Sequence, residues 1–181
     1  MTAEDAVLTR ESILAALADV KDPEIPVVSV VDLGIVQAVT VSGRDVSVAI
    51  TPTFTGCPAL EVMRAEIAAR VIELGADHVV VPVVLDPPWS TDRITPEGRA
   101  RMAMIGIAPP EHVGPGGAPG ASRVRYQADD ALSLSPTDSP VVCPWCGSAN
   151  TSQESAFGPT ICRSVHYCAS CRQSFEQFKN L

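Results

Sequence analysis

Four cysteines close to the C-terminus are spaced as ligands of a metal ion. Cys143 and Cys146 form one Cys-x-x-Cys pair and Cys168 and Cys171 form a second, with 21 residues between Cys146 and Cys168. A tight turn around each pair can place two thiolates on one side of a metal, and two such turns supply the tetrahedral set of soft ligands that zinc prefers. The spacing therefore predicts one structural zinc ion bound by these four cysteines.

A redox-active dithiol is the alternative for the first pair. A redox Cys-x-x-Cys is expected between a strand and a helix of a βαβ unit, whereas this pair follows a Gly/Pro-rich segment and has a partner pair. We therefore favour zinc, which contributes on the order of 10–16 kcal/mol to the folding of zinc-finger peptides. The fifth cysteine of this region, Cys162, is either a small buried apolar residue or an extra thiol.

The sixth cysteine, Cys57, lies in the segment Thr-Pro-Thr-Phe-Thr-Gly-Cys-Pro, just before a predicted helix. A helix N-terminus stabilises a thiolate, so Cys57 is a candidate for a reactive thiolate or for a metal or anion site. The alternative is a residue that only caps the helix or fills the core. Asp22 and Glu24 flank Pro23 at the end of the first predicted helix. They either form a solvated turn or help to hold a metal near Cys57.

Helical periodicity of the apolar residues predicts three helices. Thr9 is the expected N-cap of the first helix, which ends before Pro23. The second helix, at residues 60–74, has apolar residues at spacings of three and four, with Pro58 in its first turn. The third helix is expected at residues 96–105.

Strand patterns complete the predicted fold, which is α+β. Residues 35–41 and 45–51 predict a hairpin, and the apolar run at 78–85 predicts a strand that is covered on both faces. We expect a small domain of three helices and three or more strands in a mixed sheet, followed by a small β zinc ribbon. The predicted parts are a first domain at residues 1–107, a Gly/Pro-rich linker at 108–140 and the ribbon at 141–181.

Composition and charge argue against several classes of protein. The net charge of −8 and the pI of about 4.8 do not suit a general nucleic-acid binder, which needs a basic surface. No stretch approaches the roughly 18 apolar residues that span a bilayer, and the N-terminus has no apolar signal core. We expect a cytoplasmic protein without a membrane partner, in which cysteines serve as ligands or thiols rather than as disulfides.

Several motifs, taken in their order along the chain, resemble one known family. Asp-Pro-Glu-Ile-Pro, Val-Asp-Leu-Gly-Ile-Val and Thr-Pro-Thr-x-Thr-Gly-Cys-Pro make residues 9–107 similar to the metal-sulfur cluster assembly domain family. Pro-Pro-Trp-Ser-Thr-Asp, Gly-Ile-Ala-Pro-Pro and Cys-Pro-x-Cys-Gly-Ser extend the resemblance along the chain. The whole chain resembles the D-subunit family of the phenylacetyl-CoA epoxidase system, also called phenylacetate-CoA oxygenase.

The resemblance implies an accessory role in the ring 1,2-epoxidation of aerobic phenylacetate catabolism. The implied partners are the diiron oxygenase and reductase components, and the implied role is assembly or insertion of their iron or iron-sulfur centres rather than catalysis by this chain alone. The matching residues make Cys57, Asp22 and Glu24 candidate contacts of a transient iron ion or iron-sulfur cluster. Cys162 also matches a cysteine of the family.

Two other functions stay open. The chain could be a stoichiometric structural component of the working oxygenase. It could also be a zinc-ribbon nucleic-acid-binding protein, although residues 141–181 contain only Arg163, Arg172 and Lys179 as basic residues. An independent enzyme is least expected, because none of the three histidines lies in a recognisable catalytic motif.

Overall fold

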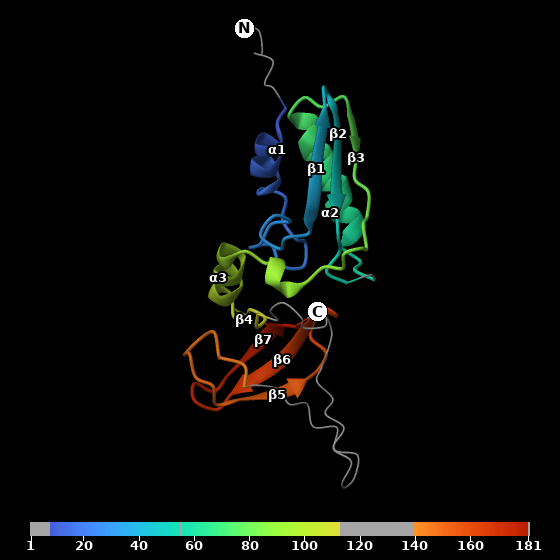
Figure 1. Ribbon diagram of the computed structural model, residues 1–181. Coiled ribbons are helices and arrows are strands. Elements are labelled where there is room, and N and C mark those ends of the chain that lie inside the picture. The colour runs from blue at the N-terminus through green and yellow to red at the C-terminus, as the bar shows by residue number, and fades with distance from the viewer. Residues whose placement is uncertain (1–7, 55, 113–139, 181) are drawn as a thin grey trace. The chain divides into compact units, whose positions relative to one another are not determined.

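The computed structural model describes residues 8–54, 56–112 and 140–180. The chain divides into two compact units, Met1–Met102 and Ala103–Leu181. Figure 1 shows a three-stranded sheet with helices in the first unit and a separate four-stranded sheet in the second. The α+β class that the sequence predicts is confirmed. Among the described residues, no helix has the length and apolar character needed to cross a membrane.

The first helix, α1 (Arg10–Leu17), begins at the predicted N-cap. The Thr9 hydroxyl oxygen accepts a hydrogen bond from the Ser12 amide at 3.1 Å, and the Thr9 amide donates to the Ser12 hydroxyl at 3.0 Å. This reciprocal capping box satisfies amides that the first turn of a helix leaves without partners. The helix buries Ile13 and Leu17 in the core of the first unit.

The sheet of the first unit contains β1 (Val36–Ser42), β2 (Asp45–Ile50) and β3 (His78–Val80), in that order. β1 and β2 form the predicted antiparallel hairpin, whereas β3 runs parallel to β2. Side chains alternate along β2, so that Val46, Val48 and Ile50 are buried. Helix α2 (Leu60–Glu73) covers the core with Met63, Ile67 and Val71, as its periodicity predicts.

The strand expected at residues 78–85 is wrong in both its length and its burial. β3 has three residues and lies at the edge of the sheet, with Val80 60% exposed and Leu85 56% exposed. Pro82 lacks an amide hydrogen, and it contributes only its carbonyl, which accepts a hydrogen bond from the Ile50 amide at 3.0 Å. The apolar run is therefore an interrupted edge segment and not a strand covered on both faces.

Two sequence motifs meet behind the hairpin of the first unit. The Trp89 indole donates a hydrogen bond to the Leu33 carbonyl at 2.9 Å, and the Thr95 amide donates to the Asp32 carbonyl at 2.9 Å. Gly34 has a φ of 64°, and a Cβ there would lie 2.2 Å from the Arg93 carbonyl oxygen, so only glycine fits. The 3-10 helix η1 (Thr91–Arg93) and helix α3 (Pro96–Met104) follow this junction.

The sheet of the second unit has the strand order β4-β7-β6-β5. Its strands are β4 (Ile107–Ala108), β5 (Thr151–Ser155), β6 (Arg163–Cys168) and β7 (Gln173–Phe178). β4 pairs parallel to β7, and the remaining pairs are antiparallel. β4 precedes most of the predicted linker in sequence and yet completes the sheet that contains the last three strands. Residues 113–139, most of the predicted linker, lie outside the described residues.

Candidate metal centre

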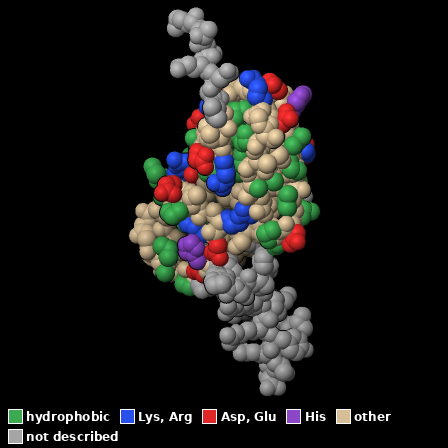
Figure 2. All heavy atoms as spheres, turned by 45° about the horizontal axis from the view of Figure 1, so that its top comes forward, with side chains coloured by type: hydrophobic (Ala, Val, Ile, Leu, Met, Phe, Trp, Pro, Cys, Tyr) green, Lys and Arg blue, Asp and Glu red, His purple; other side chains and the backbone are tan. Residues whose placement is uncertain are grey.

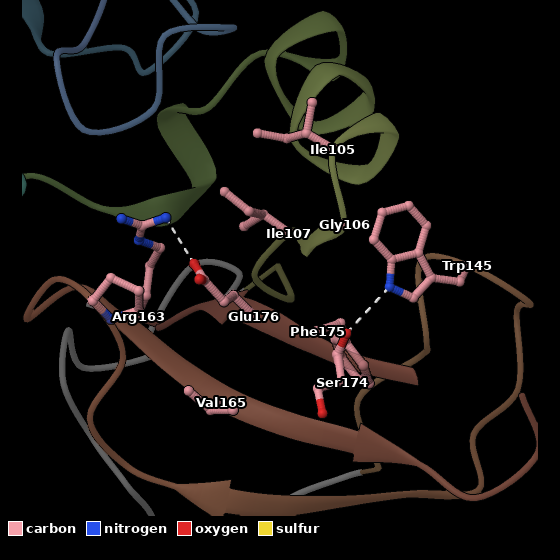
Figure 3. Close-up of a pocket in the computed structure, with 10 residues that line it drawn as sticks. Ile105, Gly106, Ile107, Trp145, Arg163, Val165, Ser174, Phe175 and Glu176 are labelled. Carbon is pink, nitrogen blue, oxygen red and sulfur yellow. Dashed lines mark hydrogen bonds and ion pairs between the residues drawn. The ribbon is translucent and has the colours of Figure 1, made fainter. Parts of the chain in front are cut away.

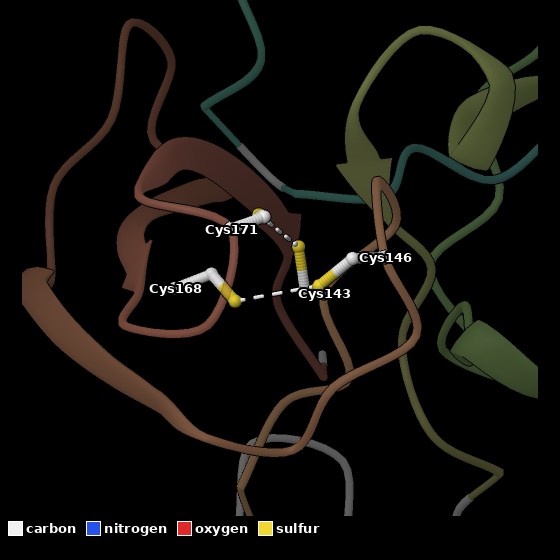
Figure 4. A group of neighbouring side chains, drawn as sticks. All are labelled: Cys143, Cys146, Cys168 and Cys171. Atoms are coloured by element: carbon white, nitrogen blue, oxygen red, sulfur yellow. Dashed lines mark hydrogen bonds between the residues drawn. The ribbon is translucent and has the colours of Figure 1, made fainter.

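The two Cys-x-x-Cys pairs bring four sulfur atoms together in the second unit (Figure 4). All four sulfurs lie within 4.8 Å of one another, and the closest pairs are Cys143–Cys171 at 3.7 Å and Cys146–Cys168 at 3.6 Å. A tetrahedral zinc with zinc–sulfur distances of about 2.3 Å requires sulfur–sulfur distances of about 3.8 Å. A disulfide would need about 2.05 Å. The arrangement therefore fits a single tetrahedral metal ion.

Both cysteine pairs are held by turns of the same kind. In the first turn, the Gly147 amide donates to the Cys143 carbonyl at 2.9 Å, and Gly147 has the positive φ of 73° that the turn requires. In the second turn, the Arg172 amide donates to the Cys168 carbonyl at 2.8 Å, and Arg172 itself has a φ of 61°. A non-glycine residue in this region is strained, and here the turn around the cysteines holds it there.

The surroundings of the thiols favour unequal ionisation. A hydrogen bond from the Cys171 backbone amide lowers the pKa of the Cys168 thiol to about 7. Burial raises the pKa of the Cys171 thiol to about 12, because desolvation and neighbouring cysteine sulfurs disfavour a second negative charge. A bound cation reverses this balance, since a coordinating thiol is deprotonated outright. Four thiols held this close together are therefore a donor set suited to a soft or borderline divalent metal.

A pocket of about 370 Å³ lies beside the first cysteine turn (Figure 3). Trp145, which stands between Cys143 and Cys146 in sequence, packs directly over Gly106. The Arg163 guanidinium pairs with the Glu176 carboxylate at 2.7 Å, so these two lining residues neutralise each other. No sequence motif predicted this pocket, because it arises from residues that are far apart along the chain.

Cys57 is half-exposed and precedes helix α2 without capping it. The N-cap of α2 is Ala59, with no side-chain hydrogen bond, and the Cys57 amide donates to the Phe54 carbonyl at 3.1 Å. The prediction that Pro58 lies in the first turn is wrong, because Pro58 precedes the N-cap. The thiol thus stands in a turn that leads into α2, where the helix dipole acts on it less strongly than on a first-turn residue.

The Asp22 carboxylate serves the turn that it occupies. Its oxygen accepts hydrogen bonds from the Glu24 amide at 2.7 Å and the Ile25 amide at 2.9 Å, and the residue is 8% exposed. Within the described residues, the four ribbon cysteines are the one set of three or more His, Cys, Asp or Glu side chains that come together closely enough for a metal ion. The structure does not bring Cys57, Asp22 and Glu24 together in such a set.

Two further residues of the ribbon belong to its interior. His166 is 3% exposed, its Nε2 atom lies 3.0 Å from the Ser164 hydroxyl, and its ring stacks on Phe175 at 5.5 Å. Cys162 is 8% exposed, and its sulfur lies 3.1 Å from the Thr160 hydroxyl. Neither residue is part of the four-cysteine group.

Comparison with protein-family models matches both parts of the chain. Residues 10–82 match the model of the iron-sulfur cluster assembly protein family, and residues 127–179 match the PaaD zinc beta ribbon domain. The second match includes all four cysteines of the candidate metal centre.

Three relatives place these matches in context. The D-subunit of 1,2-phenylacetyl-CoA epoxidase from Escherichia coli (strain K12) is 37% identical over 92% of this chain and 90% of its own length. An Fe-S protein maturation auxiliary factor of Porphyromonas gingivalis is 33% identical over 54% of this chain and 93% of its own. A crystal structure of a DUF59 domain from Bacillus anthracis has a TM-score of 0.48 and 26% identity, and covers 52% of this chain and 91% of that one.

Proposed function

Since the chain belongs to the D-subunit family of 1,2-phenylacetyl-CoA epoxidase, we propose that it is an accessory protein that assists assembly or insertion of the iron or iron-sulfur centres of that oxygenase. The observation that carries this proposal is the match of residues 10–82 to the iron-sulfur cluster assembly family. The relative that is similar over about half of the chain is described as a maturation factor of Fe-S proteins, which supports the same role. The diiron oxygenase and reductase components are its proposed partners.

Zinc is the proposed ion of the ribbon, held by Cys143, Cys146, Cys168 and Cys171. Tetrahedral sulfur spacing and the match to a zinc ribbon family support it. Zinc would neutralise the crowded thiolates and join the two cysteine turns. Its role is structural, because all four ligand positions come from the protein and none is open to a substrate.

Cys57 is the proposed contact of the iron or cluster that is handled. Its thiol is half-exposed and lies within the part of the chain that matches the assembly family. Asp22 would act on this site by holding the turn that it closes, and Glu24, which is half-exposed in the same turn, is the second candidate contact. A soft thiolate supplies the ligand type that iron-sulfur centres use.

The Cys57→Ser variant tests this function. It should fold normally, because the change is small and Cys57 makes no core of its own, yet cells that depend on it should contain epoxidase components deficient in iron and sulfide. Metal and sulfide analysis of anaerobically purified oxygenase measures the effect, and Thr53→Ser in the same loop is the matched control. Oxygenase loaded equally well with wild type and Cys57→Ser would contradict the proposed role of Cys57.

A stoichiometric structural role is the second candidate, because the relative over most of the chain is itself named as a subunit. Reconstitution separates the two roles. Fully metallated diiron and reductase components should turn over without this chain if it acts in maturation, whereas a structural component would be required in every assay.

A nucleic-acid-binding function gains no support from the surface. Charged side chains of both signs are interspersed on the face in Figure 2. Arg163 is only 9% exposed and pairs with Glu176, so it cannot contribute to a basic surface of the ribbon. Lys179 donates to the Ile161 carbonyl at 2.8 Å. Sequence-independent phosphate binding needs several accessible cations on one face, and the described part of the ribbon does not provide them.

A further inference from the structure

Helix α2 carries a second apolar stripe on the side that faces away from the core. Val62, Ala65, Ala69 and Ile72 are all exposed, with Val62 47% and Ile72 53% accessible. Their spacing of three, four and three residues puts them on one face, and a rotation of about 100° per residue places that face opposite the buried stripe of Met63, Ile67 and Val71. A solvated helix face does not require this pattern.

The borders of the stripe are acidic. Glu61 lies along one side and Glu66 and Glu73 lie along the other, and all three are exposed. The two arginines of the helix lie nearer to the body of the unit. Arg64 donates to the Val81 carbonyl at 3.1 Å, and Arg70 pairs with Asp19 at 3.0 Å, while each also bonds one border glutamate. A molecule that approaches the stripe therefore meets glutamates first.

We propose that this stripe is a docking surface for an amphipathic helix of a partner protein whose own apolar stripe is bordered by lysine or arginine. The two alanines at its centre allow close approach of a second helix, and the stripe extends about 15 Å from Val62 to Ile72 at 1.5 Å per residue. This surface does not involve Cys57 or the ribbon cysteines, so it stands independently of the proposed maturation function.

A second copy of the chain is a poor occupant of the stripe. Antiparallel pairing of two α2 helices about their midpoint would set Val62 against Ile72 and would bring Glu66 of one copy beside Glu73 of the other. Like charges at the borders of a helix pair disfavour that pairing, whereas basic residues of a partner would be attracted. The charge pattern thus selects a helix with basic borders.

Two designed helical peptides of roughly 20 residues test the proposal. They share one Leu/Ala stripe, and its borders are lysine in the first peptide and glutamate in the second. Fluorescence anisotropy at low salt should show the lysine peptide binding the full-length protein at least about tenfold more tightly than the glutamate peptide. Equal binding of the two peptides, or no binding of the lysine peptide at about 1 mM, would overturn the proposal.

Variants of the protein locate the binding. Glu66→Lys combined with Glu73→Lys should reverse the preference between the peptides, whereas Glu111→Lys with Glu154→Lys, which gives the same net charge, should leave it unchanged. Ala65→Arg with Ala69→Arg should abolish binding while keeping helix propensity, and Ala100→Arg on α3 is the matched control. Unchanged binding to the Ala65/Ala69 variant, or a wild-type dimer that this variant converts to a monomer, would refute the assignment.

Discussion

At the scale of single residues, Asp32 joins two motifs of the first unit. Its carboxylate accepts a hydrogen bond from the Ser29 amide at 2.8 Å and pairs with Arg101. Burial acts to raise the pKa of this carboxyl, but the amide and hydroxyl of Ser29 and the Arg101 charge outweigh it and hold the pKa below its ordinary value of 3.8. The charged form is therefore the one that the fold stabilises.

The pH dependence of stability follows from that direction. A carboxyl whose pKa is lowered by folding stabilises the protein above its unfolded pKa, and this contribution is lost as the pH falls through the folded pKa. Asp32→Asn should lower the free energy of unfolding by about 1–3 kcal/mol at pH 7. Urea titrations of both proteins should show the difference shrinking between pH 5 and pH 3, each value being about the range set by the ordinary carboxyl pKa. A difference that is constant with pH would mean that the charge of Asp32 is not what stabilises the junction.

The ribbon cysteines should behave as a set. The purified chain should contain about one zinc per chain, and Cys143→Ser or Cys168→Ser should lose the metal and unfold the second unit, because three thiolates leave the tetrahedral site incomplete. Elemental analysis and near-ultraviolet circular dichroism measure the two effects. Cys162→Ser is the control that should keep its zinc. Stoichiometric zinc in a protein that lacks both Cys143 and Cys146 would rule out the assigned ligands.

At the scale of elements, the turn between α3 and β4 depends on one glycine. Gly106 has a φ of 82°, and a Cβ there would lie 2.0 Å from Trp145, whereas Gly43 has a φ of 62° and open space around it. Gly106→Ala should therefore combine backbone strain with displacement of the Trp145 ring and cost about 2–4 kcal/mol, against about 1–2 kcal/mol for Gly43→Ala. Urea unfolding compares the two variants. Equal losses would show that the contact with Trp145 adds nothing to the backbone strain.

Elements with a local cause could be predicted from the sequence, and elements with a distant cause could not. The Thr9 cap, the β1–β2 hairpin and the buried face of α2 each follow from neighbouring residues. The prediction for β3 was wrong because an apolar run does not reveal whether anything covers it. β4 was missed because two residues become a strand only through β7, which lies more than 60 positions later. In the candidate site, the four cysteines were visible as a motif, but the strained φ of Arg172 and the pocket beside Trp145 were not.

At the scale of the whole molecule, the Gly/Pro-rich segment is the expected site of proteolysis. Eight of the 13 residues from Ala108 to Gly120 are glycine or proline, and such a composition does not favour the backbone hydrogen bonds that protect regular elements. Limited trypsin digestion should cut at Arg123 or Arg125. Because β4 pairs with β7, the two fragments should separate under denaturing conditions but coelute in gel filtration. Fragments that elute separately, or arginines as resistant as those of α2, would contradict this expectation.

The pairing of β4 with β7 also changes what that segment does mechanically. Residues 113–139 follow β4 and precede Cys143, so the two ends of this stretch are anchored in the same folded body. A segment of that kind closes a ring and does not act as a tether between bodies, and its length sets only a closure entropy. Doubling a flexible ring costs about 0.6 kcal/mol. A cargo sequence inserted near residue 125 should thus lower the melting temperature slightly, and a fluorophore pair on the two units should report no change in their separation.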